Sequence, residues 1–234
     1  MQRKLGCPVS AGHVGKRQRG EGYTADSVTA HVALTDRLRR SALAALCVPP
    51  AVLLHECGHW IGNVLAGLPE PTLHYASTGF RNQPAFWTAV RTGDIALAET
   101  MGSVTGAGIA AFLGIAISWG LMIGCAWLVR RPTARIVAAA VVLASAVRFV
   151  PVGVFLIRGA AEHTDEAHVA QALSAPPLLS ALILLGIVLA AISIITVVRS
   201  LPVGDRRALL IDLVGGVIAG TVLWMGFVGP ALLP

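Results

Sequence analysis

Charged residues are scarce in this chain of 234 residues. Asp, Glu, Lys and Arg together make up 13% of it, whereas hydrophobic residues make up 55% and the mean hydropathy is +0.73. Soluble domains carry about 25% charged residues, so this composition excludes an ordinary soluble domain. The sequence instead predicts an all-α, polytopic membrane protein with about five transmembrane helices.

Cysteine is also scarce. The four cysteines (Cys7, Cys47, Cys57 and Cys125) show no paired spacing, which argues against a disulfide framework and against a cysteine-based zinc site.

The first apolar run begins only at Ser41, so we expect no cleavable signal peptide at the start of the chain.

Residues 1–40 form a polar segment that carries eight of the 18 basic residues. Such a composition predicts a basic, mostly disordered tail on the cytoplasmic side of a membrane. Aromatic residues are not interleaved with the basic ones, so we expect no nucleic-acid partner.

Five apolar stretches follow, each near the length of about 20 residues that a helix needs to cross a bilayer. They cover residues 41–66, 102–129, 134–157, 178–198 and 208–228. Pro49-Pro50 interrupts the first stretch, so we expect a helix that restarts near Pro50 and ends at Gly67. The connection 68–98 is long enough to be functional.

Basic residues predict the orientation of these spans. Beyond the tail, the second and fourth connections carry three each, whereas the first and third carry two and one. Because basic connections stay in the cytoplasm, we expect a cytoplasmic N-terminus and an extracytoplasmic C-terminus in a cell membrane. The third connection, which contains Asp165, then lies on the outer side.

The most informative stretch is His55-Glu56-Cys57-Gly58-His59, inside the first apolar run. Residues four apart share one face of a helix, so the two imidazoles can bind one zinc ion. Glu56 then lies beside the metal, where it can accept a proton from zinc-bound water, whose pKa is about 7. The pattern predicts peptide-bond hydrolysis, with His55 and His59 as ligands and Glu56 as the catalytic base.

A plainer interpretation of the motif is that both histidines are hydrogen-bonded interior residues and that Glu56 is their partner. Ionisable residues inside a membrane span are rare and are by default functional, which favours the metal site. Arg148, near the middle of the third span, is open to two interpretations: a partner for a buried acid, or a contact for a substrate carbonyl.

The motif on the first core helix, a second span rich in small residues and an acidic residue after a proline-containing third span resemble the site-2 protease family. Members of this family are intramembrane zinc metalloproteases. The resemblance covers roughly residues 51–172. It implies that His55, His59 and a later aspartate bind Zn2+, and that Glu56 is the general base.

The later aspartate departs from the family pattern of Asn-x-x-Pro followed closely by Asp-Gly. This chain has Arg148-Phe149-Val150-Pro151, and Asp165 follows fourteen residues after the proline. We expect Asp165 to be the third ligand, and Glu99 is its main rival because Glu99 opens the second span on the same side. The other candidates are His168, Glu166, His163, Asp94 and His74.

Taken together, residues 41–234 are expected to form a transmembrane metalloprotease-like domain with a membrane protein or peptide as substrate. Two other functions stay open. The first is a catalytically inert relative that acts as a membrane scaffold. The second is a metal-handling or transport protein, although no inverted repeat is visible between the halves of the chain.

Overall fold

The computed structural model of the protein describes residues 25–233. The chain divides into two units, residues 1–35 and 36–234, and every element of the site described below belongs to the second. For residues 1–24 the predicted disordered tail lies outside the described residues. Residues 25–40, which the sequence analysis included in that tail, belong to helix α1 (Ala25–Leu46).

The helical end of the expected tail has a physical reason. Its Leu, Ala and Arg residues are good helix formers. In addition, Nε of Arg37 lies 3.0 Å from Oδ1 of Asp212, and Nε of Arg40 lies 3.6 Å from Oδ2 of the same residue. Asp212 is buried in a later helix, so the ion pairs hold this part of α1 against the bundle.

The described residues are mostly helical, and their only strands form one short hairpin, which confirms the all-α prediction. In the part that the structure describes, five helical segments are long and apolar enough to cross a membrane: Ala33–Leu65, Val104–Leu128, Arg135–Ile157, Pro176–Ser200 and Arg206–Leu232. Each overlaps one of the five predicted spans. The polytopic membrane fold with about five transmembrane helices is therefore confirmed.

Prolines interrupt two of these segments. In the first, α1 ends at Leu46 and α2 (Val48–Leu65) begins immediately before Pro49-Pro50, as predicted. In the third, α6 (Arg135–Ala146) is separated from α7 (Phe149–Ile157) near Arg148. Pro151 has no N–H to offer to the carbonyl of Val147, four residues earlier, which weakens the helix at this point.

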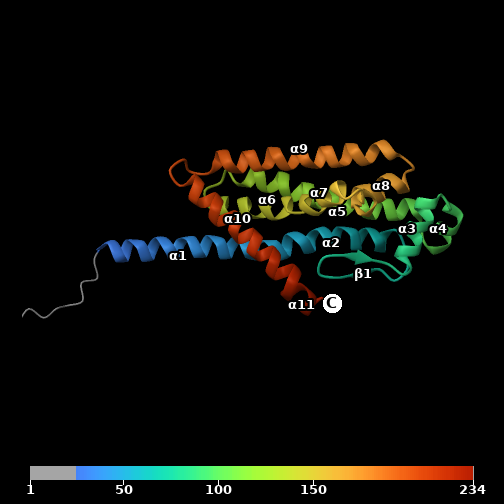
Figure 1. Ribbon diagram of the computed structural model, residues 1–234, viewed down its shortest axis with the longest axis horizontal. Coiled ribbons are helices and arrows are strands. Elements are labelled where there is room, and N and C mark those ends of the chain that lie inside the picture. Colours follow the sequence, from blue (N-terminus) through green and yellow to red (C-terminus); the bar gives the residue numbers. More distant parts are fainter. Residues whose placement is uncertain (1–24, 234) are drawn as a thin grey trace, which may run out of the picture. The chain divides into compact units, whose positions relative to one another are not determined.

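Helix α5 (Val104–Leu128) is the central element of residues 36–234. It packs most extensively on α2, and it also contacts α6, α8 (Asp165–Ala172) and α9 (Pro176–Ser200). Figure 1 shows α2, α5, α6, α7 and α9 running lengthwise beside one another, while α10 (Arg206–Leu223) crosses them obliquely. The arrangement brings the first, second and third spans together around one site.

The connections at one end of the bundle have structure of their own. The first contains an antiparallel hairpin, β1 (Thr72–Leu73) and β2 (Thr78–Gly79), followed by the helices α3 (Gln83–Thr92) and α4 (Ile95–Met101). The third contains a short 3-10 helix, η1 (Ala161–His163), and then α8. In the register of the hairpin, Leu73 pairs with Thr78.

The end of the chain packs against this hairpin. After α10 the last span continues as a π-helical turn, η2 (Trp224–Val228), and as α11 (Gly229–Leu232). Nε1 of Trp224 donates to the carbonyl of Tyr75 at 3.1 Å, and the backbone N–H of Tyr75 donates to the carbonyl of Leu233 at 3.3 Å. These bonds hold the turn between β1 and β2 against the end of the last span.

Candidate metal centre

Three ligand atoms from two helices converge on one point. Nε2 of His55 lies 3.1 Å from Nε2 of His59. Oδ2 of Asp165 lies 3.2 Å from the first nitrogen and 3.4 Å from the second. The two histidines come from α2 and the aspartate from α8, so the fold brings together residues that are more than a hundred positions apart in the sequence.

Hydrogen bonds to α5 set the orientation of both imidazoles. Nδ1 of His59 lies 2.9 Å from the carbonyl oxygen of Ala110, and Nδ1 of His55 lies 2.8 Å from that of Gly114. A carbonyl only accepts, so Nδ1 of each ring carries a proton and donates, which leaves Nε2 as the nitrogen that can bind a metal ion or a second proton. The hydroxyl of Ser118 also contacts this nitrogen of His55, Nδ1, at 2.9 Å.

A glycine on α5 makes room for the second histidine. The imidazole of His59 occupies the space that a Cβ at Gly114 would fill, against three atoms of the ring. Gly58 on α2 allows the close crossing from the other side, because a Cβ there would lie 2.9 Å from the Cα of Gly114. The small residues of these two helices therefore position the imidazoles as well as letting the helices pack.

Asp165 occupies the first position of α8. The hydroxyl of Thr164 caps this helix by accepting a hydrogen bond from the backbone N–H of Ala167 at 3.2 Å. A carboxylate in the first turn also interacts favourably with the helix dipole. Burial opposes ionisation of Asp165, but the two facing imidazoles outweigh it and hold the pKa of this carboxyl well below its usual range.

An arginine supports the aspartate from the break in the third span. Nη2 of Arg148 lies 2.7 Å from Oε1 of Glu166 and 3.5 Å from Oδ2 of Asp165. Glu166 is buried, and its burial raises the pKa of its carboxyl, an effect that the charge of Arg148 opposes. Of the two interpretations offered for Arg148, the structure contains the ion pair with a buried acid.

The donor set fits a zinc ion. Two imidazole lone pairs and a carboxylate oxygen repel one another at these distances unless a cation or a proton lies between them. Ligands about 2.0–2.2 Å from a tetrahedral zinc lie about 3.3 Å apart, close to the three separations found here. Histidines that donate from Nδ1 to backbone carbonyls are also the usual arrangement at metal sites.

Glu56 lies on the same helix as the two histidines and is buried. Oγ1 of Thr78, in strand β2, lies 2.9 Å from the Oε2 of Glu56 and 2.9 Å from its backbone carbonyl oxygen. The hydroxyl can donate to the carboxylate, which holds the side chain in place. The hairpin therefore positions the carboxylate expected to act as the base.

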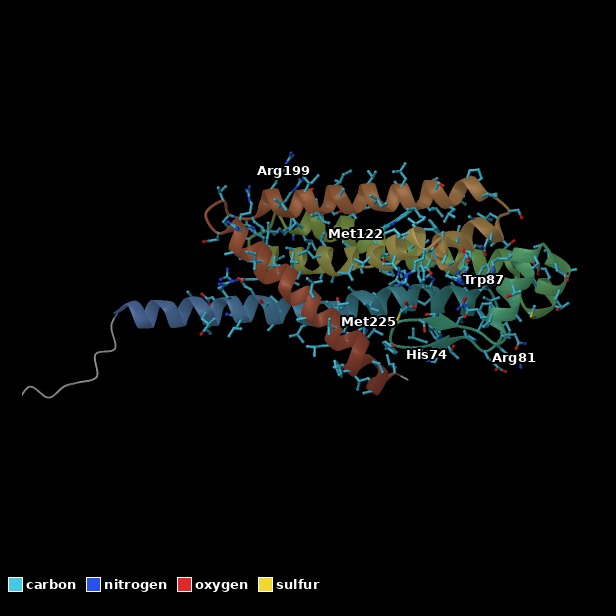
Figure 2. All side chains as sticks on the ribbon, in the orientation of Figure 1. His74, Arg81, Trp87, Met122, Arg199 and Met225 are labelled. Atoms are coloured by element: carbon cyan, nitrogen blue, oxygen red, sulfur yellow. The ribbon has the colours of Figure 1, made fainter. Side chains whose placement is uncertain are left out.

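A cavity of about 680 Å³ opens onto these groups. His55, Glu56, His59 and Asp165 line it together with apolar residues of the third and fifth spans, namely Val150, Pro151, Val152, Val154, Phe155 and Met225. Its volume is within the range of about 300–1,000 Å³ that is usual for ligand sites. Figure 2 labels Met225, which the last span contributes to this wall.

The rival third ligands lie elsewhere or have other contacts. Glu99 is not part of the group: its Oε1 accepts from the backbone N–H of Val104 at 2.9 Å and so caps α5. Asp94 caps α4 in the same way, through Leu97. His163 and His168 line the cavity, and Glu166 pairs with Arg148. The hairpin residue His74 does not line it.

Sequence reasoning missed several of the groups around the site. Thr78, Ser118 and Asn63 line the cavity, and the carbonyls of Ala110 and Gly114 orient the imidazoles. Asn63 had a detectable pattern, since it follows His59 by four residues and must share its helix face. The other groups come from distant parts of the chain and have no local pattern that would point to His55 or Glu56.

Comparison of the chain with protein-family models, with curated proteins and with solved structures found no match. The fold and the site define a broad class of protein: an all-α polytopic membrane protein in which two histidines and an aspartate could hold a metal ion. The resemblance to the site-2 protease family stays a prediction.

Proposed function

We propose that this protein is an intramembrane zinc metallopeptidase that hydrolyses peptide bonds of membrane-associated substrates. The observation that carries the proposal is the convergence of His55 Nε2, His59 Nε2 and Asp165 Oδ2 within 3.4 Å of one another. Glu56 faces the same cavity, so a three-ligand site and a carboxylate base occur together.

A zinc ion held by His55, His59 and Asp165 would supply Lewis acidity, which would polarise a peptide carbonyl and make water acidic enough to lose a proton near pH 7. Glu56 accepts that proton while the water oxygen forms a bond to the carbonyl carbon. Glu56 then passes the proton to the nitrogen of the leaving amine as the C–N bond breaks. Thr78 keeps the carboxylate in position through both transfers.

The walls of the cavity support a substrate from the membrane. Val150, Val154 and Phe155 on α7 and Met225 on η2 present apolar side chains beside the polar site. A peptide with apolar side chains can bury them there, which contributes about 25 cal/mol per Å² of apolar area removed from water. A helical substrate must unwind locally, because its carbonyls are otherwise hydrogen-bonded within the helix.

The charge distribution supports an orientation with a cytoplasmic N-terminus. Arg199 lies on α9 toward one end of the bundle and Trp87 toward the other, as Figure 2 shows. The connection that contains Arg199, between the fourth and fifth spans, also contains Arg206 and Arg207. The connection after the second span contains Arg130 and Arg131. A basic end of this kind stays in the cytoplasm, which puts the metal site in the outer half of the membrane.

Purified protein in lipid nanodiscs tests the proposal through its zinc content and its proteolysis of a library of transmembrane peptides. We expect one zinc per chain in the wild type, little zinc in His55→Ala, and full zinc without proteolysis in Glu56→Gln. Zinc absent from the wild type favours an inert scaffold. Zinc that is bound in nanodiscs and carried into sealed liposomes containing the protein, with no peptide cleaved, favours metal handling.

A further inference from the structure

His168 has no assigned role in the site described so far, yet it faces the same cavity. It lies on α8, three residues after Asp165, and residues three apart on a helix lie on the same face. It does not belong to the group of three convergent ligand atoms. Among the described residues, no side-chain hydrogen bond engages its ring nitrogens.

An aromatic stack determines the orientation of this imidazole. The ring of His168 lies parallel to that of Trp87, with an interplanar angle of 10° and 4.1 Å between centroids. Trp87 is itself buried and packs edge-to-face on Phe86 in α3, 5.0 Å away. Figure 2 shows Trp87 where α3 approaches α8. The stack covers one face of the imidazole and leaves its edges, which carry both nitrogens, free to reach a ligand.

The charge state of His168 suits a hydrogen-bond donor. Burial lowers the pKa of His168 to about 4, so the ring is neutral at pH 7. A neutral imidazole carries one N–H donor and one acceptor nitrogen. It can therefore donate one hydrogen bond to an oxygen without adding a positive charge to the site.

We propose that His168 is a further catalytic residue, which donates a hydrogen bond to the carbonyl oxygen of the scissile peptide as that oxygen becomes negatively charged. The inference rests on the proposed peptidase function. Donors that meet a developing oxyanion in a site sheltered from water typically contribute about 10²–10³ in kcat. Trp87 is a positioning residue, because its stacked ring fixes the plane of the His168 imidazole.

Paired substitutions separate a donor from a packing residue. His168→Phe keeps a flat ring on Trp87 and removes the donor, whereas His168→Asn and His168→Gln keep an N–H near one or the other ring nitrogen and lose the stack. We expect His168→Phe to lower kcat by about a hundredfold, with KM and zinc content unchanged. We expect at least one of the two amide variants to keep more activity than His168→Phe, because it keeps a donor. His74→Phe, the same change at a histidine that does not line the cavity, is the matched control.

A second measurement does not depend on proteolysis. The protein is loaded with cobalt, and methylphosphonate, a small tetrahedral oxyanion, is titrated while the visible spectrum of the metal is recorded. We expect His168→Phe to weaken methylphosphonate binding by about tenfold, the value of one lost hydrogen bond to an anion, with binding to His74→Phe unchanged.

The two measurements can fail separately. Equal methylphosphonate affinity in the wild type and His168→Phe overturns the role of His168 as a donor. The same conclusion follows if His168→Phe keeps full kcat while the two amide variants lose activity, because the stacked ring and not the N–H then matters. A wild type that cleaves no peptide, while His168→Phe still weakens methylphosphonate binding, removes the proposed peptidase function and leaves His168 as a donor to anions at the metal.

Discussion

Nδ1 of His59 lies 2.9 Å from the carbonyl oxygen of Ala110, a residue 51 positions further along the chain. The same kind of bond joins His55 to Gly114, one turn further along α5. A single helix therefore orients both imidazoles, and the geometry of the metal centre depends on how closely α2 and α5 pack. The second span therefore orients both histidines of the candidate metal site.

Gly114→Ala tests that dependence. The added Cβ would overlap the ring of His59, so we expect the imidazole to move and zinc to be lost. Gly124→Ala on the same helix is the matched control, because its Cβ would meet nothing within 4 Å. Zinc content and thermal unfolding are measured for both. Full zinc occupancy in Gly114→Ala would show that the close approach is not required.

Asp165→Asn and Glu99→Gln distinguish the two candidates for the third ligand. The first change removes the carboxylate that lies beside both imidazoles, and we expect a loss of zinc affinity beyond the 10–100-fold or so that a supporting residue costs. The second removes only a cap of α5, so zinc affinity stays near that of the wild type. Competition with a fluorescent zinc chelator reports both values. The reverse pattern would exclude the proposed ligand set.

Thr78→Val removes the hydroxyl that contacts the carboxylate of Glu56, while keeping the size of the side chain. A hydrogen bond to a charged group contributes about 1.5–3 kcal/mol, so we expect kcat to fall by at least about tenfold with zinc content unchanged. Thr88→Val, on the exposed side of α3, is the control for loss of a threonine hydroxyl. Unchanged kcat in Thr78→Val would mean that Glu56 needs no support from the hairpin.

Single cysteines test the orientation in the membrane, with the four native thiols replaced. Glu162→Cys, whose native side chain is 43% exposed, lies beside α8. Val203→Cys, at a residue that is 81% exposed, lies in the connection between α9 and α10. We expect an impermeant maleimide added outside intact cells to label position 162 and not 203, as the basic residues near Arg206 predict. Labelling of 203 alone would invert the proposed topology.

The sequence by itself determined the features that depend on local pattern. Apolar stretches of about 20 residues predict the five spans, because a bilayer requires that length of helix. Pro49-Pro50 predicts the break before α2, because proline lacks the N–H that a helix interior needs. The spacing of His55 and His59 places them on one face, because it approximates one helical turn.

Only the tertiary structure decided which distant groups meet at that face. Asp165 and Glu99 are chemically equivalent candidates in the sequence, but capping by Thr164 holds the first beside the imidazoles, while the second caps α5. Thr78 reaches Glu56 through a hairpin held by the end of the chain. Contacts of this kind depend on the packing of helices and connections that are far apart in sequence. Local periodicity in the sequence does not predict which of these segments will be in contact.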